Sequence, residues 1–105
     1  MLGKITPPNL KTNESSFAKS EVTPPASVDW RGNKILTPIK DQGWCGSCWA
    51  FSASQILESA IAIKTNTTAV RLSEQEYVSC AGADGYGCNG GFEEDAWNYA
   101  IKMKG

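Results

Sequence analysis

The segment from Trp49 to Ile61 constrains the fold of this chain more than any other, because its apolar side chains recur with helical spacing. They fall at i, i+4, i+7, i+8, i+11 and i+12, which places them on one face of a helix. The positions are Trp49, Ala53, Ile56, Leu57, Ala60 and Ile61. The polar side chains of Ser52, Gln55 and Ser59 lie on another face. The segment therefore predicts a buried amphipathic helix of about 16 residues.

Two shorter helices are predicted further along the chain. Ser73 at the N-cap and Glu76 three residues later fit a capping box, which starts a helix that ends near Cys80. Residues 82–91 contain five glycines and are expected to form a loop. A third helix, about Phe92 to Lys104, has acidic side chains in its first turn and lysines in its last, as the helix dipole favours. Its expected apolar face comprises Phe92, Ala96, Tyr99, Ala100 and Met103.

The composition divides the chain into an extended leader, residues 1–26, and a folded part, residues 27–105. The leader holds four of the five prolines and few large apolar side chains, so it cannot offset the entropy cost of ordering. All four tryptophans and all four cysteines follow it, and Trp30, Trp49 and Trp97 are expected in the core. Pro38 limits residues 35–40 to a short edge strand at most.

Charge and composition exclude several functional classes. Ten Lys and Arg against eleven Asp and Glu give a net charge of -1, so there is no basic excess for binding nucleic acid. No apolar run approaches the ~20 residues that cross a bilayer, and no signal peptide is visible. Histidine is absent, so these 105 residues cannot supply an imidazole base.

Two sequons, Asn13-Glu14-Ser15 and Asn66-Thr67-Thr68, would be glycosylated only on the secretory route.

Cys48 stands where the long helix begins, behind Gly46 and Ser47. The unpaired N–H groups and positive dipole end of a helix favour a thiolate there, and this is a suitable position for a nucleophile. An arbitrary cysteine is more often a small buried hydrophobe or half of a disulfide. An alternative is that Cys45-Gly46-Ser47-Cys48 is a redox-active or zinc-binding CxxC motif. Residues 37–44 do not provide a thioredoxin-like strand, and the cysteine spacing without histidine is poor for zinc, so no metal and no cofactor is expected.

Several short motifs follow one another in unbroken order between residues 26 and 105. They are Asp29-Trp30-Arg31, Thr37-Pro38-Ile39-Lys40-Asp41-Gln42-Gly43, Cys45-Gly46-Ser47-Cys48-Trp49, Leu72-Ser73-Glu74-Gln75-Glu76 and Gly87-Cys88-Asn89-Gly90-Gly91-Phe92. The motif around Cys48 matches the signature of papain and the cathepsins. The chain thus resembles the papain-like cysteine peptidases. This resemblance implies an α+β, papain-like fold, of which residues 27–105 form mainly the helical (left) domain, with the barrel-like half missing.

The resemblance also implies catalytic roles. Cys48 would be the nucleophile that forms an acyl-enzyme. The side chain of Gln42 and the backbone N–H of Cys48 would stabilise the oxyanion. The family's histidine and asparagine lie about 130–150 residues after the cysteine, beyond this chain. The chain alone is therefore expected to be inactive.

Substrate contacts and disulfides follow from the same resemblance. Gly46, Gly90 and Gly91 would line the path of an extended substrate, and Phe92 and Glu93 would lie at the wall of a side-chain pocket. Cys45 would pair with Cys88. Cys80 matches a half-cystine whose partner lies further along the chain, so it would be left unpaired here.

The resemblance finally implies a biological setting. The substrates would be polypeptides, and the partners would include the remainder of the peptidase domain and cystatin-like inhibitors. The setting would be lysosomal, vacuolar or secreted, and residues 1–26 would be the end of a propeptide that is removed from a zymogen. The alternative is a truncated, non-catalytic binding module or relic that keeps the substrate groove.

Overall fold

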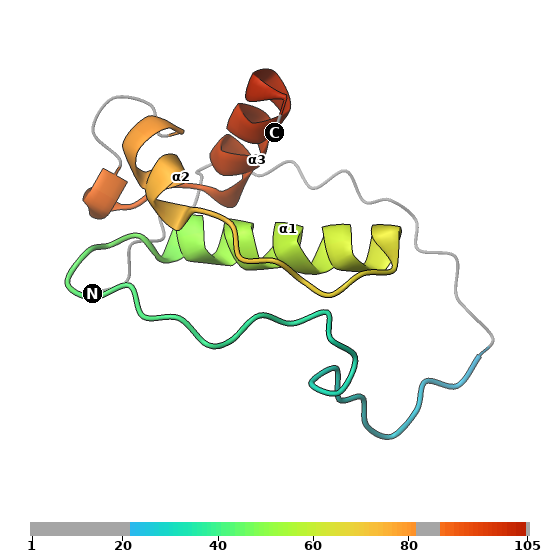
Figure 1. The fold of residues 1–105 in the computed structure, drawn as a ribbon. Helices are drawn as coiled ribbons and strands as arrows, with labels where there is room; N and C mark the ends of the chain where they lie inside the picture. Colours follow the sequence, from blue (N-terminus) through green and yellow to red (C-terminus); the bar gives the residue numbers. More distant parts are fainter. Residues whose placement is uncertain (1–21, 82–86, 105) are drawn as a thin grey trace.

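A computed structural model describes residues 22–81 and 87–104 (Figure 1). The elements in this part are α1 (Cys48–Thr65), α2 (Glu74–Cys80), the 3-10 helix η1 (Gly87–Asn89) and α3 (Glu93–Met103). Within these ranges there is no strand, so residues 35–40 do not form even the short edge strand that the sequence allowed. Of the expected leader, only residues 22–26 fall inside the described ranges.

The predicted long helix is confirmed as α1, but it buries a different face from the expected one. Ile56 and Ile61 were expected in the buried stripe and are 52% and 45% exposed. The residues that α1 buries are Trp49, Ala50, Ala53, Ser54, Glu58 and Ala62. Apolar side chains are spread widely around this helix, so its neighbours decide which side is covered. The neighbours of α1 are α2 and α3 on one side, and the two extended segments that precede α1 and α2 run along the helix (Figure 1).

Both shorter helices are confirmed close to their expected bounds. Ser73 caps α2, because its Oγ accepts a hydrogen bond from the backbone N–H of Glu76. In α3, Phe92 is the N-cap and Lys104 the C-cap. The expected apolar face of α3 is only partly covered, since Ala96 is fully buried while Met103 near the open end is 54% exposed.

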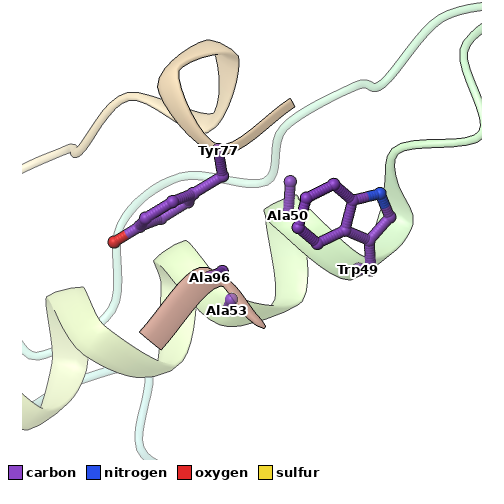
Figure 2. Packing of buried hydrophobic residues seen from close by; sticks show 5 residues of the cluster. All are labelled: Trp49, Ala50, Ala53, Tyr77 and Ala96. Carbon is purple, nitrogen blue, oxygen red and sulfur yellow. The ribbon is translucent and has the colours of Figure 1, made fainter. Parts of the chain in front are cut away.

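The core lies where the three helices meet. It consists of Trp49, Ala50 and Ala53 from α1, Tyr77 from α2 and Ala96 from α3 (Figure 2). Small alanines at the crossing of α1 and α3 let the two backbones approach closely, and the large rings of Trp49 and Tyr77 fill the space beside them. These contacts fix the beginning of α1.

The tryptophans divide between core and surface. Trp49 is buried as expected. Trp97 is half-buried and donates from its Nε1 to the carbonyl oxygen of Ala53 at 3.3 Å, which ties α3 to α1. The expectation for Trp30 is wrong, because its side chain is 54% exposed in the segment before α1.

A buried ion cluster joins three segments beside α1. Lys40 bonds to Glu58 of α1 at 2.5 Å and also to Glu74 at the start of α2. Glu58 accepts two further hydrogen bonds, from the hydroxyl of Thr37 at 2.5 Å and from the backbone N–H of Leu72 at 2.7 Å. The cluster therefore holds both extended segments against the long helix (Figure 1).

None of the helices described is both long and apolar enough to cross a membrane.

Candidate active site

Cys48 is the first residue of α1 and carries a free, half-buried thiol. The preceding residue, Ser47, is the N-cap, and its carbonyl oxygen accepts from the N–H groups of Ala50 and Phe51. The Ser47 side chain makes no capping hydrogen bond, and the first turn contains no acidic residue. The positive end of the helix dipole is thus not offset by a carboxylate in that turn. The expected placement of Cys48 at the beginning of a long helix is confirmed.

A disulfide and two hydrogen bonds fasten the loop after α2 to the beginning of α1. Cys45 and Cys88 form the disulfide, with their Cα atoms 4.7 Å apart. The N–H of Gly46 donates to the carbonyl oxygen of Cys88 at 2.8 Å. The indole Nε1 of Trp49 donates to the carbonyl oxygen of Gly87 at 3.1 Å. Contacts from residues just before and just after Cys48 therefore hold the beginning of α1 to a segment about forty residues further along the sequence.

Gln42 is held in a tight turn just before the disulfide. Its Nε2 donates to the carbonyl oxygen of Cys45 at 2.7 Å. The turn is closed by Asp41, whose carboxylate accepts from the N–H of Gly43 at 2.8 Å. Gly43 has a φ of 60°, a value that an L side chain rarely adopts. A side-chain amide nitrogen has two hydrogens, so the bond to Cys45 leaves a second one for another acceptor.

Two hollows lie next to these residues. One, of about 540 Å³, is lined by Gln42, Gly43, Trp44 and Cys45, with the Trp44 side chain fully exposed. The other, of about 360 Å³, is also lined by Gln42 and Cys45, together with Asp41, Ser47, Phe51, Glu74, Gln75, Val78 and Cys88. Cys48 itself is not among the lining residues of either hollow. The structure therefore places Gln42 and Cys45 beside both hollows, whereas Cys48, three residues after Cys45, lines neither of them.

Gly90 and Gly91 follow the disulfide-bonded Cys88, and each has a structural reason to be glycine. Both are buried, and Gly90 has a φ of 122°. A Cβ built on Gly91 would lie 2.6 Å from the indole ring of Trp49, so only glycine fits against that ring. Phe92 and Glu93 follow at the start of α3, and both are partly buried.

The ion cluster supports the segment that carries Gln42, because Lys40 is two residues before it. The Lys40 and Glu58 side chains are 2% and 0% exposed. Burial is the largest single influence on both groups and opposes their charge. The other interactions together outweigh it: the bonds and charges of Glu58 and Glu74 for Lys40, and the bonds from Lys40, Thr37 and Leu72 with the charge of Lys40 for Glu58. As a result the pKa of Lys40 is raised and that of Glu58 is lowered. Both groups are charged at neutral pH.

Sequence reasoning missed this cluster. Glu58 lies among apolar residues of the predicted helix, and Lys40 lies in a segment without clear periodicity. The single acidic residue of the predicted helix was the only available signal. Cys80, which was expected to be unpaired, carries an exposed thiol outside any disulfide. The part of the chain that the structure covers has no group of three residues suited to hold a metal ion.

Comparison with known proteins assigns the chain to a family. A family model described as papain family cysteine protease matches residues 24–105. Cysteine proteinase 2 from Dictyostelium discoideum is 51% identical over 84 residues, which are 79% of this chain and 22% of that protein. Procathepsin L from Mus musculus is 52% identical over 82 residues, covering 77% of this chain and 24% of the mouse protein.

Solved structures agree with the sequence matches. A recombinant stem bromelain precursor has a TM-score of 0.70 and 44% identity, over 77% of this chain and 26% of the other. A digestive procathepsin L2 proteinase from Tenebrio molitor has a TM-score of 0.76 and 36% identity, over 96% and 34%. The chain spans about a quarter of the curated relatives that it matches. Its helices are those of the helical part of the papain-like fold. On the family model and these relatives together, the chain belongs to the papain family of cysteine proteases.

Proposed function

We propose that Cys48 is the nucleophile of a cysteine peptidase that acts on polypeptides. The observation that carries this proposal is its free thiol at the first residue of α1, in a chain of the papain family. A general base must come from outside these 105 residues, which contain no histidine. The proposal therefore concerns the complete protein, with the remainder of the peptidase domain as a partner.

In the proposed reaction the Cys48 thiolate attacks the carbonyl carbon of a peptide bond. The new bond joins Sγ to that carbon, and the electron pair of the carbonyl moves to its oxygen. The backbone N–H of Cys48 and the second N–H of the Gln42 amide would stabilise this oxyanion. The C–N bond then breaks, and the leaving amine takes a proton from the protonated form of the base that lies outside these 105 residues. Water then hydrolyses the acyl-enzyme.

The positioning of Gln42 supports its role as an oxyanion donor. Its amide is held by the carbonyl oxygen of Cys45, and Cys45 is itself held by the disulfide to Cys88. A donor whose orientation is fixed before the reaction costs little reorganisation when charge develops.

We assign the substrate path to Gly46, two residues before Cys48, and to Gly90 and Gly91, which follow the disulfide-bonded Cys88 in the sequence. Gly46, Gly90 and Gly91 would let an extended peptide approach the backbone, and Phe92 and Glu93 would border a side-chain pocket. The bond from Gly46 to the carbonyl oxygen of Cys88 supports this, because it holds the two glycine-containing segments side by side. A lysosomal, vacuolar or secreted setting and regulation by cystatin-like inhibitors are part of the same proposal.

The test is peptide hydrolysis by the complete protein and its variants. Cys48→Ser should abolish activity, and Gln42→Ala should lower kcat by about 10²–10³-fold. Asn98→Ala is the control, because Asn98 also carries a side-chain amide, is exposed on α3 and lines neither of the two hollows beside Gln42. Unchanged activity in Cys48→Ser would disprove the assignment. Separately, residues 1–105 alone should show no cysteine-dependent turnover, and turnover by them would disprove the need for an external base.

A further inference from the structure

We propose that Asn66 is an N-glycosylation site, modified by transfer of an oligosaccharide from a lipid-linked donor. The sequence Asn66-Thr67-Thr68 is the acceptor pattern for this transfer. The proposal rests on the lysosomal, vacuolar or secreted setting proposed above, because the donor is met on the secretory route. It does not depend on peptidase activity.

The structure presents Asn66 as an accessible acceptor. It follows the last residue of α1 as the C-cap, and Asn66, Thr67 and Thr68 are all exposed. Its backbone is left-handed, with φ 53° and ψ 44°, a conformation that asparagine tolerates better than most residues. The chain then continues without regular structure through residues 67–73. A bulky group at this position would project from a turn at the surface.

The role of Asn66 in the fold uses its backbone and not its side chain. Its N–H donates to the carbonyl oxygens of Ala62 and Ile63, and this closes the last turn of α1. Substituting one hydrogen of the side-chain amide therefore leaves the cap intact. The neighbouring hydroxyls of Thr65 and Thr67 bond to each other at 2.8 Å, and the hydroxyl of Thr68, the residue that the acceptor pattern requires, is not part of that pair.

Asn66 is also remote from the candidate active site. Cys48 and Asn66 lie at opposite ends of α1 (Figure 1). At about 1.5 Å per residue the helix separates them by roughly 27 Å. Neither hollow beside Gln42 and Cys45 includes residues of this turn. A glycan on Asn66 is thus compatible with access of a polypeptide to Cys48.

The chemical step balances without a redox partner. The side-chain amide nitrogen of Asn66 forms a bond to the anomeric carbon of the first sugar. The bond from that carbon to the pyrophosphate oxygen of the lipid donor breaks, and the lipid pyrophosphate leaves. The amide nitrogen loses one proton, which passes to the solvent. The co-reactant is a lipid-pyrophosphate-linked oligosaccharide.

The experiment is secretion of the complete protein by a eukaryotic host through a cleavable signal peptide, followed by peptide mapping. The peptide containing Asn66 should carry an N-glycan, and amidase release should leave aspartate at position 66. Thr68→Ala should remove the glycan while leaving Asn66 and its cap unchanged. Thr67→Ala is the matched control, because the altered middle residue preserves the acceptor pattern and the glycan should remain. Peptide mapping also separates this site from Asn13.

Two results would overturn the proposal. One is secreted protein in which the Asn66 peptide is unmodified, and the other is a glycan on that peptide that persists in Thr68→Ala. Peptide hydrolysis is measured on the same samples. A glycosylated protein without activity would contradict the peptidase proposal alone. An active protein without the glycan would contradict the glycosylation proposal alone.

Discussion

Lys40 and Glu58 form an ion pair from which water is almost completely excluded, with Nζ and Oε1 2.5 Å apart and side chains 2% and 0% exposed. Glu74 contacts the same ammonium group. Two carboxylates thus share one buried cation, and the hydroxyl of Thr37 and the N–H of Leu72 complete the set of partners around Glu58. Buried charges are tolerated only when they are paired in this way.

Removing the charge of Glu58 should therefore destabilise the protein strongly. We expect Glu58→Gln to lower the free energy of unfolding by about 3 kcal/mol, the lower end of the range for breaking a buried pair, because Glu74 still contacts Lys40. Urea unfolding of the purified protein measures this. The control is Asp29→Asn, which breaks the exposed pair between Asp29 and Arg31 and should change stability little. Equal effects of the two substitutions would show that burial of the Lys40 cluster is energetically unimportant.

The same pair should make stability depend on pH in the acidic range. The pKa of Glu58 is lowered on folding, because its bonds to Lys40, Thr37 and Leu72 outweigh the burial that opposes its charge. Its contribution is therefore fully present above the pKa of an unfolded glutamate, about 4.3, and is lost as the pH falls through the lower folded value. The stability difference between the wild type and Glu58→Gln should shrink as the pH is lowered below about 4. A difference that stays constant from neutral pH to pH 3 would contradict this explanation.

Gly91 should not accept a side chain. In Gly91→Ala the new Cβ would meet the ring of Trp49 at 2.6 Å, and this indole is buried in the core and tethered to Gly87. We expect a loss of about 1–3 kcal/mol in the free energy of unfolding. Gly32→Ala is the control, because nothing lies within 4 Å of its added Cβ. Similar stability of the two variants would show that the contact with Trp49 relaxes without cost.

Ser54 and Ser73 should respond in opposite directions to replacement by alanine. The hydroxyl of Ser54 is buried without a hydrogen-bond partner among the residues that the structure covers, so Ser54→Ala should leave stability unchanged or raise it by up to about 1 kcal/mol. The hydroxyl of Ser73 caps α2, so Ser73→Ala should cost about 1 kcal/mol. Thermal or urea unfolding of both variants tests the pair. A loss on Ser54→Ala as large as that on Ser73→Ala would mean that Ser54 has a partner such as a bound water.

The sequence by itself determined the helices and the candidate nucleophile. Local signals suffice for these features: Ser73 and Glu76 define the start of α2, and the motif around Cys48 places a cysteine at the beginning of a long helix. Such signals depend on neighbours within a few residues, so they can be recognised without knowing the fold.

Only the tertiary structure decided which faces are covered and which charges are paired. Ile56 and Ile61 were expected to be buried and are about half exposed, while Glu58 between them is buried. The apolar side chains of α1 are spread around most of the helix. Their spacing therefore does not show which side meets the segments that carry Lys40 and Leu72. The indole Nε1 of Trp49 likewise donates to the carbonyl oxygen of Gly87, which is 38 positions away in the sequence. Burial and pairing arise between segments distant in sequence, and this is why they could not be predicted from local pattern.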